Sequence, residues 1–383
     1  MTGADSPSFP AGGPSPPDRP RGDAPGVFVF SLDAELAWGT FDEGGDRSFR
    51  RHLARTRPAV AGLLSLFGRY RISATWAFVG HLFLESCARE RPGDDPHPDV
   101  RTPSYAWYPF PWHHRDPSLD RRRAPFWYGD DLVDQVIAAD PPQDVGCHTF
   151  SHIPMDDPAV TEEIAASQIA KCCELARRRG LRMRSFVFPR HSVAHLPVLA
   201  RYGFTCYRGP EEPWYRRFPS GLRPAFHFLH RLLALTPPVY RSLSPGPDGL
   251  VNIPSSMFLM PPDGIRRLIP GGSRVAQAAR GIRRAAESGG VFHLWIHPWN
   301  LGSSPRMLDW IERILRVVSD LRARGRLRVM TMKSLAEEVR RNARADLRAD
   351  GGIPAGPGPG RGAGPRVPDR VRDPGMPVAA SGP

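Results

Sequence analysis

Short apolar runs alternate with helix-patterned segments along most of the chain. Apolar residues recur every three or four positions at 132–137 and 307–318, which predicts amphipathic helices. The apolar runs, typical of buried parallel strands, are 27–32, 72–79, 145–147, 185–188, 205–207, 250–253, 291–296 and 327–330. Seven or eight β/α repeats of this kind predict an α/β fold whose parallel sheet closes into a barrel.

Polar residues capable of chemistry follow several of these runs. They are Asp33 and Glu35, His148 and His152, Arg190, and His297. Because the loops after the strands gather at one rim of a β/α barrel, we expect these side chains to meet there. Two insertions interrupt the repeat, at about 85–127 and 208–248, and the first could wall a cleft at that rim.

Composition separates a central domain from two tails. The chain has 383 residues with 44 Pro and 37 Gly, too many for helices and strands alone. Residues 1–26 and 343–383 hold much of that excess and little to bury, so we expect both to be disordered around a domain at 27–342. No signal sequence and no apolar run of membrane-spanning length is present, which favours a cytoplasmic protein with five free cysteines.

The formal charge of +13 comes mostly from arginine and resides on the central domain. No nucleic-acid-binding motif accompanies the charge, so we expect no nucleic-acid partner. An anionic substrate or an anionic membrane surface would be attracted by the same field. The segment 216–241 joins an apolar stripe at 226–235 to neighbouring arginines; we expect 226–235 to form a buried core helix, and a peripheral membrane contact is the alternative.

The histidine pair in GlyCysHisThrPheSerHis has the spacing of metal ligands. His148 and His152 project from one face if the chain turns helically after the strand, while surface or capping histidines are the alternative. Asp33 and Glu35, two apart, share a face and offer one carboxylate to a metal while leaving the other free. Arg190 could keep such a carboxylate ionised, and His297 lies in a turn at the rim.

Five segments in order make a family resemblance specific. SerLeuAspAlaGluLeuAlaTrpGly, AlaThrTrpAlaPheValGlyHisLeu, GlyCysHisThrPheSerHis, PheValPheProArg and PheHisLeuTrpIleHisProTrpAsn resemble the polysaccharide deacetylases with a NodB homology domain. The resemblance covers about residues 27–340. It implies an irregular (β/α) barrel of about seven strands and removal of acetyl groups from sugars with a divalent metal, most often zinc.

The resemblance also implies roles for the polar residues at the rim. Glu35, His148 and His152 would bind the metal, Asp33 would be the catalytic base steadied by Arg190, and His297 the general acid. Leu294 would line the acetyl pocket, and we expect Trp38, Trp295 and Trp299 beside the cleft as substrate-binding residues. Ala34 stands where many members carry a metal-binding aspartate, so the assignment to Glu35 assumes a spaced variant.

The expected activity is therefore N-deacetylation of a sugar. Water activated by the metal would attack the acetamide carbonyl, with Asp33 as base and His297 as acid. A cytoplasmic location favours a nucleotide-linked or lipid-linked sugar as substrate. Two alternatives stay open: hydrolysis of a non-sugar linear or cyclic amide on the same fold, and a catalytically inactive glycan-binding module.

Overall fold

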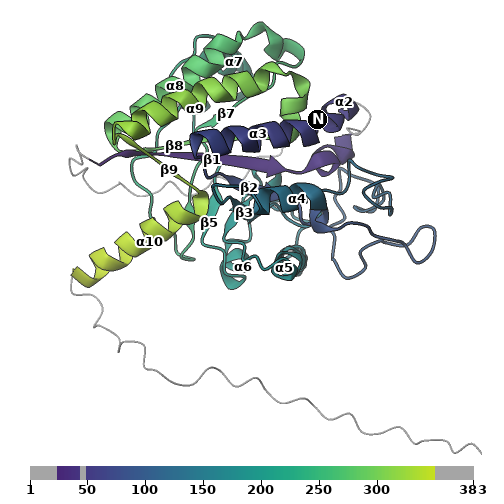
Figure 1. The fold of residues 1–383 in the computed structure, drawn as a ribbon. Coiled ribbons are helices and arrows are strands. Elements are labelled where there is room, and N and C mark those ends of the chain that lie inside the picture. Colours follow the sequence, from purple (N-terminus) through teal and green to yellow (C-terminus); the bar gives the residue numbers. More distant parts are fainter. Residues whose placement is uncertain (1–23, 44–48, 350–383) are drawn as a thin grey trace, which may run out of the picture. The chain divides into compact units, whose positions relative to one another are not determined.

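The computed structural model describes residues 24–43 and 49–349 (Figure 1). The described residues up to Ala343 belong to one compact unit, and the helix that begins at Met332 continues to Ala349. Most of the predicted disordered tails, 1–26 and 343–383, lies outside the described residues. The exceptions are ordered: Gly26 begins the first strand, and residues 343–349 are helical.

All nine strands of the described residues belong to one parallel sheet, which confirms the predicted α/β class. The strands are β1 (Gly26–Ala34), β2 (Thr75–Phe78), β3 (Asp144–Cys147), β4 (Ser185–Val187), β5 (Cys206–Arg208), β6 (Val251–Asn252), β7 (Met257–Phe258), β8 (Val291–Ile296) and β9 (Leu327–Met330). Their order is β6-β5-β4-β3-β2-β1-β8-β7, with β9 beside β1. All eight predicted strands are present, and only the two-residue β7 was missed.

The sheet curls until its two end strands are joined by a short link. Four residues, 253–256, connect β6 to β7. Within this link the backbone nitrogen of Ser255 donates to the carbonyl of Gly209 after β5, at 3.0 Å. The next nitrogen, of Ser256, donates to the carbonyl of His293 on β8, at 2.8 Å. The link therefore bridges the opening of a partly closed barrel, in agreement with the expected irregular barrel.

Strand β1 has three parallel neighbours and is buried along its whole length. One edge pairs with β8, while the other pairs first with β9 and then with β2. Val27 and Val29 lie in the small apolar cluster inside the curled sheet, and Phe28 and Phe30 lie in the large cluster under the helices. Since strand side chains alternate between faces, Asp33 faces inward above the valines.

Helices cover the outside of this sheet, with α8 and α9 packed on one another and α8 on β1 (Figure 1). The α-helices are α2 (Arg50–Ala54), α3 (Thr56–Tyr70), α4 (Asp130–Ile137), α5 (Glu162–Arg178), α6 (Leu196–Arg201), α7 (Arg223–Leu232), α8 (Gly271–Ser288), α9 (Arg306–Ala323) and α10 (Met332–Ala349). The 3-10 helices are Leu36–Gly39, Phe41–Glu43, Gly80–Phe83, Pro189–His191, Trp214–Arg217, Ser220–Leu222, Gly264–Leu268 and Pro298–Ser303. The amphipathic helices predicted at 132–137 and 307–318 correspond to α4 and α9.

The two predicted insertions differ in character. The first, between Phe83 and α4, contains neither an α-helix nor a named strand among its residues, whereas the second contains α7. The expectation that 226–235 forms a buried core helix is wrong, because Leu229, Leu233 and Leu235 are exposed. Among the described residues, no helix is both long enough and apolar enough to cross a membrane.

Candidate metal and catalytic site

The loops after β1, β3 and β8 converge at the carboxyl edge of the sheet. They bring Glu35, His148 and His152 together, with one ligand atom of each within 4.8 Å of the others. His297 joins them from the end of β8, with its Nε2 3.5 Å from Glu35 Oε1 and 4.0 Å from Asp33 Oδ2. Five of the six side chains that were predicted to meet at one rim therefore lie together, and the sixth, Arg190, contacts Asp42 instead.

The geometry around Glu35 fits a divalent cation. Its Oε2 lies 3.4 Å from His148 Nε2 and 3.1 Å from His152 Nε2. Neighbouring N and O ligands of tetrahedral zinc stand ~3.3 Å apart, given bonds of about 2.0–2.2 Å. His148 Nδ1 lies 2.8 Å from the Val187 carbonyl, to which it donates its proton, so its Nε2 presents a lone pair toward Glu35. One acidic and two imidazole ligands form a common zinc donor set.

Electrostatics keep these ligands in the protonation states that a metal requires. Burial acts to raise the pKa of Glu35, but His297, His148 and His152 outweigh it and hold that pKa well below its usual value. Burial lowers the pKa of His152 despite the opposing effect of Glu35. A carboxylate and an unprotonated imidazole are therefore both present at neutral pH.

Asp33 is held by Arg208 and not by Arg190, so the predicted partner is corrected. Arg208, at the end of β5, donates from Nη1 to Asp33 Oδ1 and from Nη2 to Oδ2, both at 2.6 Å. Its Nη1 also donates to Ser31 Oγ at 3.0 Å. Burial acts to raise the pKa of Asp33, yet the adjacent guanidinium brings it below its usual value, so Asp33 is ionised.

Arg190 instead donates to Asp42 Oδ2 at 2.6 Å and lies 5.6 Å from the centroid of the Trp107 ring. It occupies a left-handed backbone conformation after β4, with φ 53°. That turn directs its guanidinium toward the loop after β1 and the first insertion. The motif PheValPheProArg favours Arg190. Arg208 was missed because it falls at the start of the predicted insertion 208–248.

His297 is oriented by its own loop. Its Nδ1 lies 3.1 Å from Asn300 Oδ1, to which it donates, and its ring packs between Trp295 and Trp299 at centroid distances of 5.3 Å. The side chain retains 21% exposure, whereas Glu35 and Asp33 are almost fully buried. His297 is thus the most solvent-accessible of the converging groups.

The loop that carries His148 and His152 is irregular rather than helical. Thr149 and His152 adopt left-handed conformations, with φ 59° and 58°, which cost energy in residues other than glycine. Gln168 of α5 compensates, because its Oε1 accepts hydrogen bonds from the backbone nitrogens of Phe150 and Ser151 at 3.1 and 3.0 Å. Gln168 is a positioning residue that sequence reasoning did not find, because a glutamine within a helix carries no local signal.

Two expected substrate-binding residues lie away from this site. Leu294 alternates with Trp295 on β8 and packs in the large cluster under the helices, so it does not line an acetyl pocket. Trp38 is fully buried, and its Nε1 donates to the Trp127 carbonyl at 3.3 Å. Trp295 and Trp299 do lie beside His297. Leu294 faces the helices because side chains alternate along β8, and Trp38 is covered by the first insertion.

Glu35 is fixed by two further residues. Trp299 Nε1 donates to Glu35 Oε1 at 2.9 Å, which directs Oε2 toward the histidines. Gly39 lies under the same carboxyl group, where an added Cβ would fall 2.1 Å from both Cδ and Oε1. A residue with a side chain at position 39 would therefore displace Glu35.

Comparisons with known proteins show which solved structures share this fold. No family model matches the chain, and no curated protein matches it in sequence. A solved structure from Mycobacterium smegmatis, assigned to the polysaccharide deacetylases, is similar with TM-score 0.52 and 15% identity, covering 86% of this chain and 95% of the other. A Pseudomonas aeruginosa PAO1 structure with the same assignment gives 0.51 and 12%, covering 85% and 95%.

A third similar structure is the Puue allantoinase, with TM-score 0.51 and 12% identity, covering 89% of this chain and 96% of the other. The chain thus has the NodB-like deacetylase fold that the sequence motifs suggested. At these identities the likeness establishes the fold, and the chemistry must be argued from the site.

Replacing Arg208 tests the corrected partner of Asp33. We expect Arg208→Met to lower the free energy of unfolding by about 3–5 kcal/mol, because it leaves a carboxylate buried without its cation. The folded pKa of Asp33 lies below the unfolded value, so its contribution is present above about pH 4 and lost as the pH falls. Chemical denaturation between pH 3 and 7 would measure both effects; Arg324→Met, which removes only an exposed ion pair with Asp320, is the control and should cost less.

Substituting Gly39 tests how closely Glu35 is held. We expect Gly39→Ala to weaken zinc binding roughly 10–100-fold, since the new methyl group displaces the carboxylate. Competition with a chromogenic chelator would measure the change in affinity. Gly272→Ala is the control, because a Cβ there meets no atom within 4 Å. Equal zinc affinity in both variants would show that Glu35 is not a ligand.

Proposed function

We propose that this protein is a metal-dependent hydrolase that removes the acetyl group from an N-acetylated sugar. The observation that carries the proposal is the convergence of Glu35, His148 and His152 on one point, beside an ionised Asp33 and an accessible His297. The NodB-like deacetylase fold supports it. Amide hydrolysis needs a polarised carbonyl, an activated water and a proton for the leaving nitrogen, and this arrangement offers a group for each.

Glu35, His148 and His152 would hold the cation, for which zinc suits the donor set best. When bound, it supplies Lewis-acid polarisation of the acyl carbonyl and lowers the pKa of water. The protein contributes the fixed ligand directions, through the Val187 carbonyl behind His148 and the Trp299 indole behind Glu35. Three protein ligands leave a coordination position open, as catalytic rather than structural zinc sites do.

Asp33 and His297 would perform the proton transfers. Asp33, kept ionised by Arg208, accepts the proton of the attacking water as general base. His297, whose Nε2 lies on the side away from Asn300, would donate a proton to the amine as the carbon–nitrogen bond breaks. The products are acetate and an amino sugar. Trp295 and Trp299 contact His297 and would hold its ring in position.

A second candidate reaction is hydrolysis of a cyclic amide. It is favoured by the similarity to the Puue allantoinase, and it uses the same cation, base and acid. The two candidates differ in their products, because deacetylation releases acetate whereas ring opening releases no separate fragment. Incubating the zinc-loaded protein with N-acetylhexosamine conjugates and with allantoin therefore distinguishes them.

Replacing the base and the acid tests the proposed mechanism. We expect Asp33→Asn and His297→Ala each to reduce kcat for acetate release by roughly 10²–10⁴-fold while the protein keeps its zinc. Asp144→Asn is a matched control, because this buried carboxyl group lies at the other end of β3, bonded to Thr75 and Ser185. The mechanism is wrong if Asp33→Asn and Asp144→Asn retain the same activity.

The carrier of the sugar is suggested by a surface around α7. Several large apolar side chains are exposed there: Trp214, Phe218, Leu222, Leu229, Leu233, Ile265 and Leu268. Exposed arginines interleave with them at positions 216, 217, 223, 266 and 267. Apolar side chains among cations match an anionic lipid surface. This arrangement supports a lipid-linked over a nucleotide-linked substrate and a peripheral membrane contact through 216–241.

Vesicle flotation tests the membrane contact. We expect the protein to float with phosphatidylglycerol vesicles and to be released by salt, because arginine attraction is screened. A double variant, Leu229→Gln with Leu233→Gln, should float less, whereas Leu347→Gln, an exposed leucine on α10, should behave as wild type. If wild-type protein stays at the bottom of the gradient, the membrane contact is excluded and a nucleotide carrier is favoured.

A further inference from the structure

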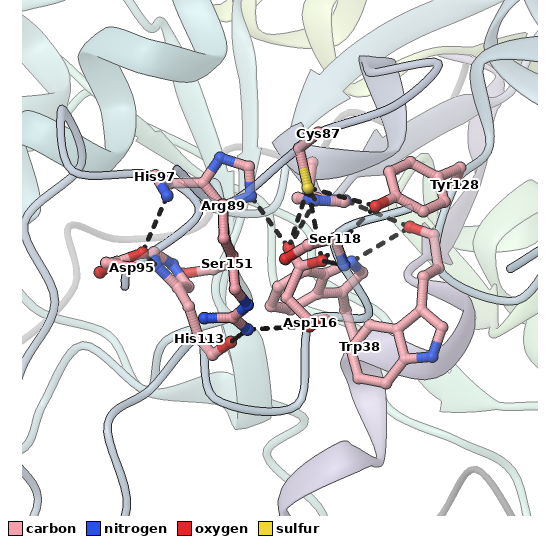
Figure 2. Close-up of polar contacts among 12 residues, drawn as sticks. Trp38, Cys87, Arg89, Asp95, His97, His113, Asp116, Ser118, Tyr128 and Ser151 are labelled. Carbon is pink, nitrogen blue, oxygen red and sulfur yellow. Dashed lines mark hydrogen bonds and ion pairs between the residues drawn. The ribbon is translucent and has the colours of Figure 1, made fainter. Parts of the chain in front are cut away.

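A second group of potential metal ligands lies in the first insertion, apart from the site described above. It consists of His81, Cys87, His97 and Asp116, and one ligand atom of each lies within 4.8 Å of the others. His81 belongs to the 3-10 helix Gly80–Phe83 after β2, and the other three come from the irregular chain that follows. Figure 2 shows Cys87, Asp116 and Tyr128 linked by dashed contacts in this cluster.

The four ligand atoms surround one point. His81 Nε2 and His97 Nε2 each lie 2.9 Å from Asp116 Oδ2. Cys87 Sγ lies 3.8 Å from His81 Nε2 and 3.6 Å from Asp116 Oδ2. In a tetrahedral zinc site with bonds of about 2.0–2.3 Å, adjacent ligand atoms are ~3.3–3.6 Å apart. The distances between these ligand atoms differ from the tetrahedral spacing by only a few tenths of an ångström.

The two atoms that His81 faces provide a separate argument for a cation. Its Nδ1 lies 3.2 Å from the Trp127 carbonyl and its Nε2 faces the Asp116 carboxylate, so both ring nitrogens face acceptors. A neutral imidazole has one N–H, and the other nitrogen would then direct a lone pair at a carboxylate oxygen. A cation between Nε2 and Asp116 removes this conflict.

His148 shows the same arrangement at the proposed catalytic site. There Nδ1 faces the Val187 carbonyl and Nε2 faces the Glu35 carboxylate. In both places a backbone carbonyl fixes the ring and leaves Nε2 for a ligand, as outer-sphere partners of metal-binding histidines do. Each cluster therefore holds a histidine with a backbone carbonyl at Nδ1 and a carboxylate at Nε2, although the two clusters lie in different loops.

A catalytic cysteine is a poorer explanation of the second cluster. In a nucleophilic triad the thiol and the carboxylate contact opposite nitrogens of the imidazole, whereas Cys87 and Asp116 both lie at His81 Nε2. A metal would convert the same thiol into a thiolate ligand.

We propose that His81, Cys87, His97 and Asp116 form a second metal site, which holds a structural zinc ion. One thiolate, one carboxylate and two neutral imidazoles balance the charge of Zn²⁺. Four protein ligands complete a tetrahedron and leave no position for substrate, which is the property of structural rather than catalytic zinc. The ligands are nearly or fully buried except for Cys87, which is half-buried.

The second site would anchor the insertion to the barrel. The insertion in turn supports the loop that carries His148 and His152: Trp112 Nε1 donates to the Ser151 carbonyl and Tyr105 Oη to the Pro154 carbonyl, both at 2.7 Å. Aromatic side chains of the insertion pack in the large core cluster, and a zinc ion would add a further fixed point in a segment that forms no α-helix or named strand. The structural zinc would thereby stabilise the catalytic loop without contacting substrate.

Metal counting is the first test. We expect about two zinc ions per wild-type chain by elemental analysis, and about one in either Cys87→Ser or His152→Ala. Each variant should lose the zinc ion of a different site. This result does not depend on the chain being a deacetylase. A wild-type chain with one zinc ion that disappears in His152→Ala and persists in Cys87→Ser would overturn the second site.

Cobalt substitution is the second test, and the result that would overturn the proposal comes from the wild-type protein alone. Cobalt(II)-loaded wild-type protein should show thiolate-to-cobalt charge-transfer absorption in the near ultraviolet. Cys87 would be the source, because the second cluster contains this cysteine and the Glu35, His148 and His152 cluster contains none. The band should persist in His152→Ala and in Cys173→Ser, a half-buried cysteine outside both clusters, and vanish in Cys87→Ser. Absence of the band from the fully loaded wild-type protein would contradict thiolate ligation and hence the proposed site.

Discussion

Burying two carboxylates at the end of β1 is the constraint on which the architecture of the site depends. Asp33 and Glu35 are each only 3% exposed, and an ionised carboxyl group in that environment is stable only with compensating charge. Arg208 supplies that charge for Asp33 through two parallel hydrogen bonds. For Glu35 the neighbours are His148 and His152, which supply a full positive charge only if they are protonated or share a cation with it.

This requirement explains the distribution of strain and support around the site. The backbone accepts left-handed conformations at Thr149 and His152 so that both imidazoles reach Glu35, and Gln168 secures the resulting loop from α5. The first insertion adds further hydrogen bonds to the same loop through aromatic side chains. Rigid ligand placement thus depends on contacts between segments that are distant in sequence.

Sequence patterns were sufficient for most of the sheet because buried parallel strands are continuous apolar runs. The strand β7 was missed although it is no shorter than β6, because it follows β6 after four residues with no helix between them. The rim position of Glu35, His148 and His297 followed from the same logic. Arg208 could not be found this way, since the choice between two arginines after adjacent strands depends on how the sheet curls. Trp38 was misplaced because nothing local to it reveals that the first insertion buries it.

The second cluster illustrates a different limit. His81, Cys87, His97 and Asp116 have irregular spacing, and their ligand atoms meet only after an insertion without regular elements has folded. Sequence motifs for metal sites depend on short fixed intervals, which a long irregular segment does not provide. Cys87 therefore resembled an ordinary free thiol until its three-dimensional neighbours were known.

The central claim is that Glu35, His148 and His152 bind a single ion. Anomalous diffraction at the zinc absorption edge from crystals of the zinc-loaded protein tests it most directly. We expect a peak about 2.0–2.2 Å from Glu35 Oε2, His148 Nε2 and His152 Nε2. A fully loaded crystal with no anomalous peak within coordination distance of these three atoms would contradict the account.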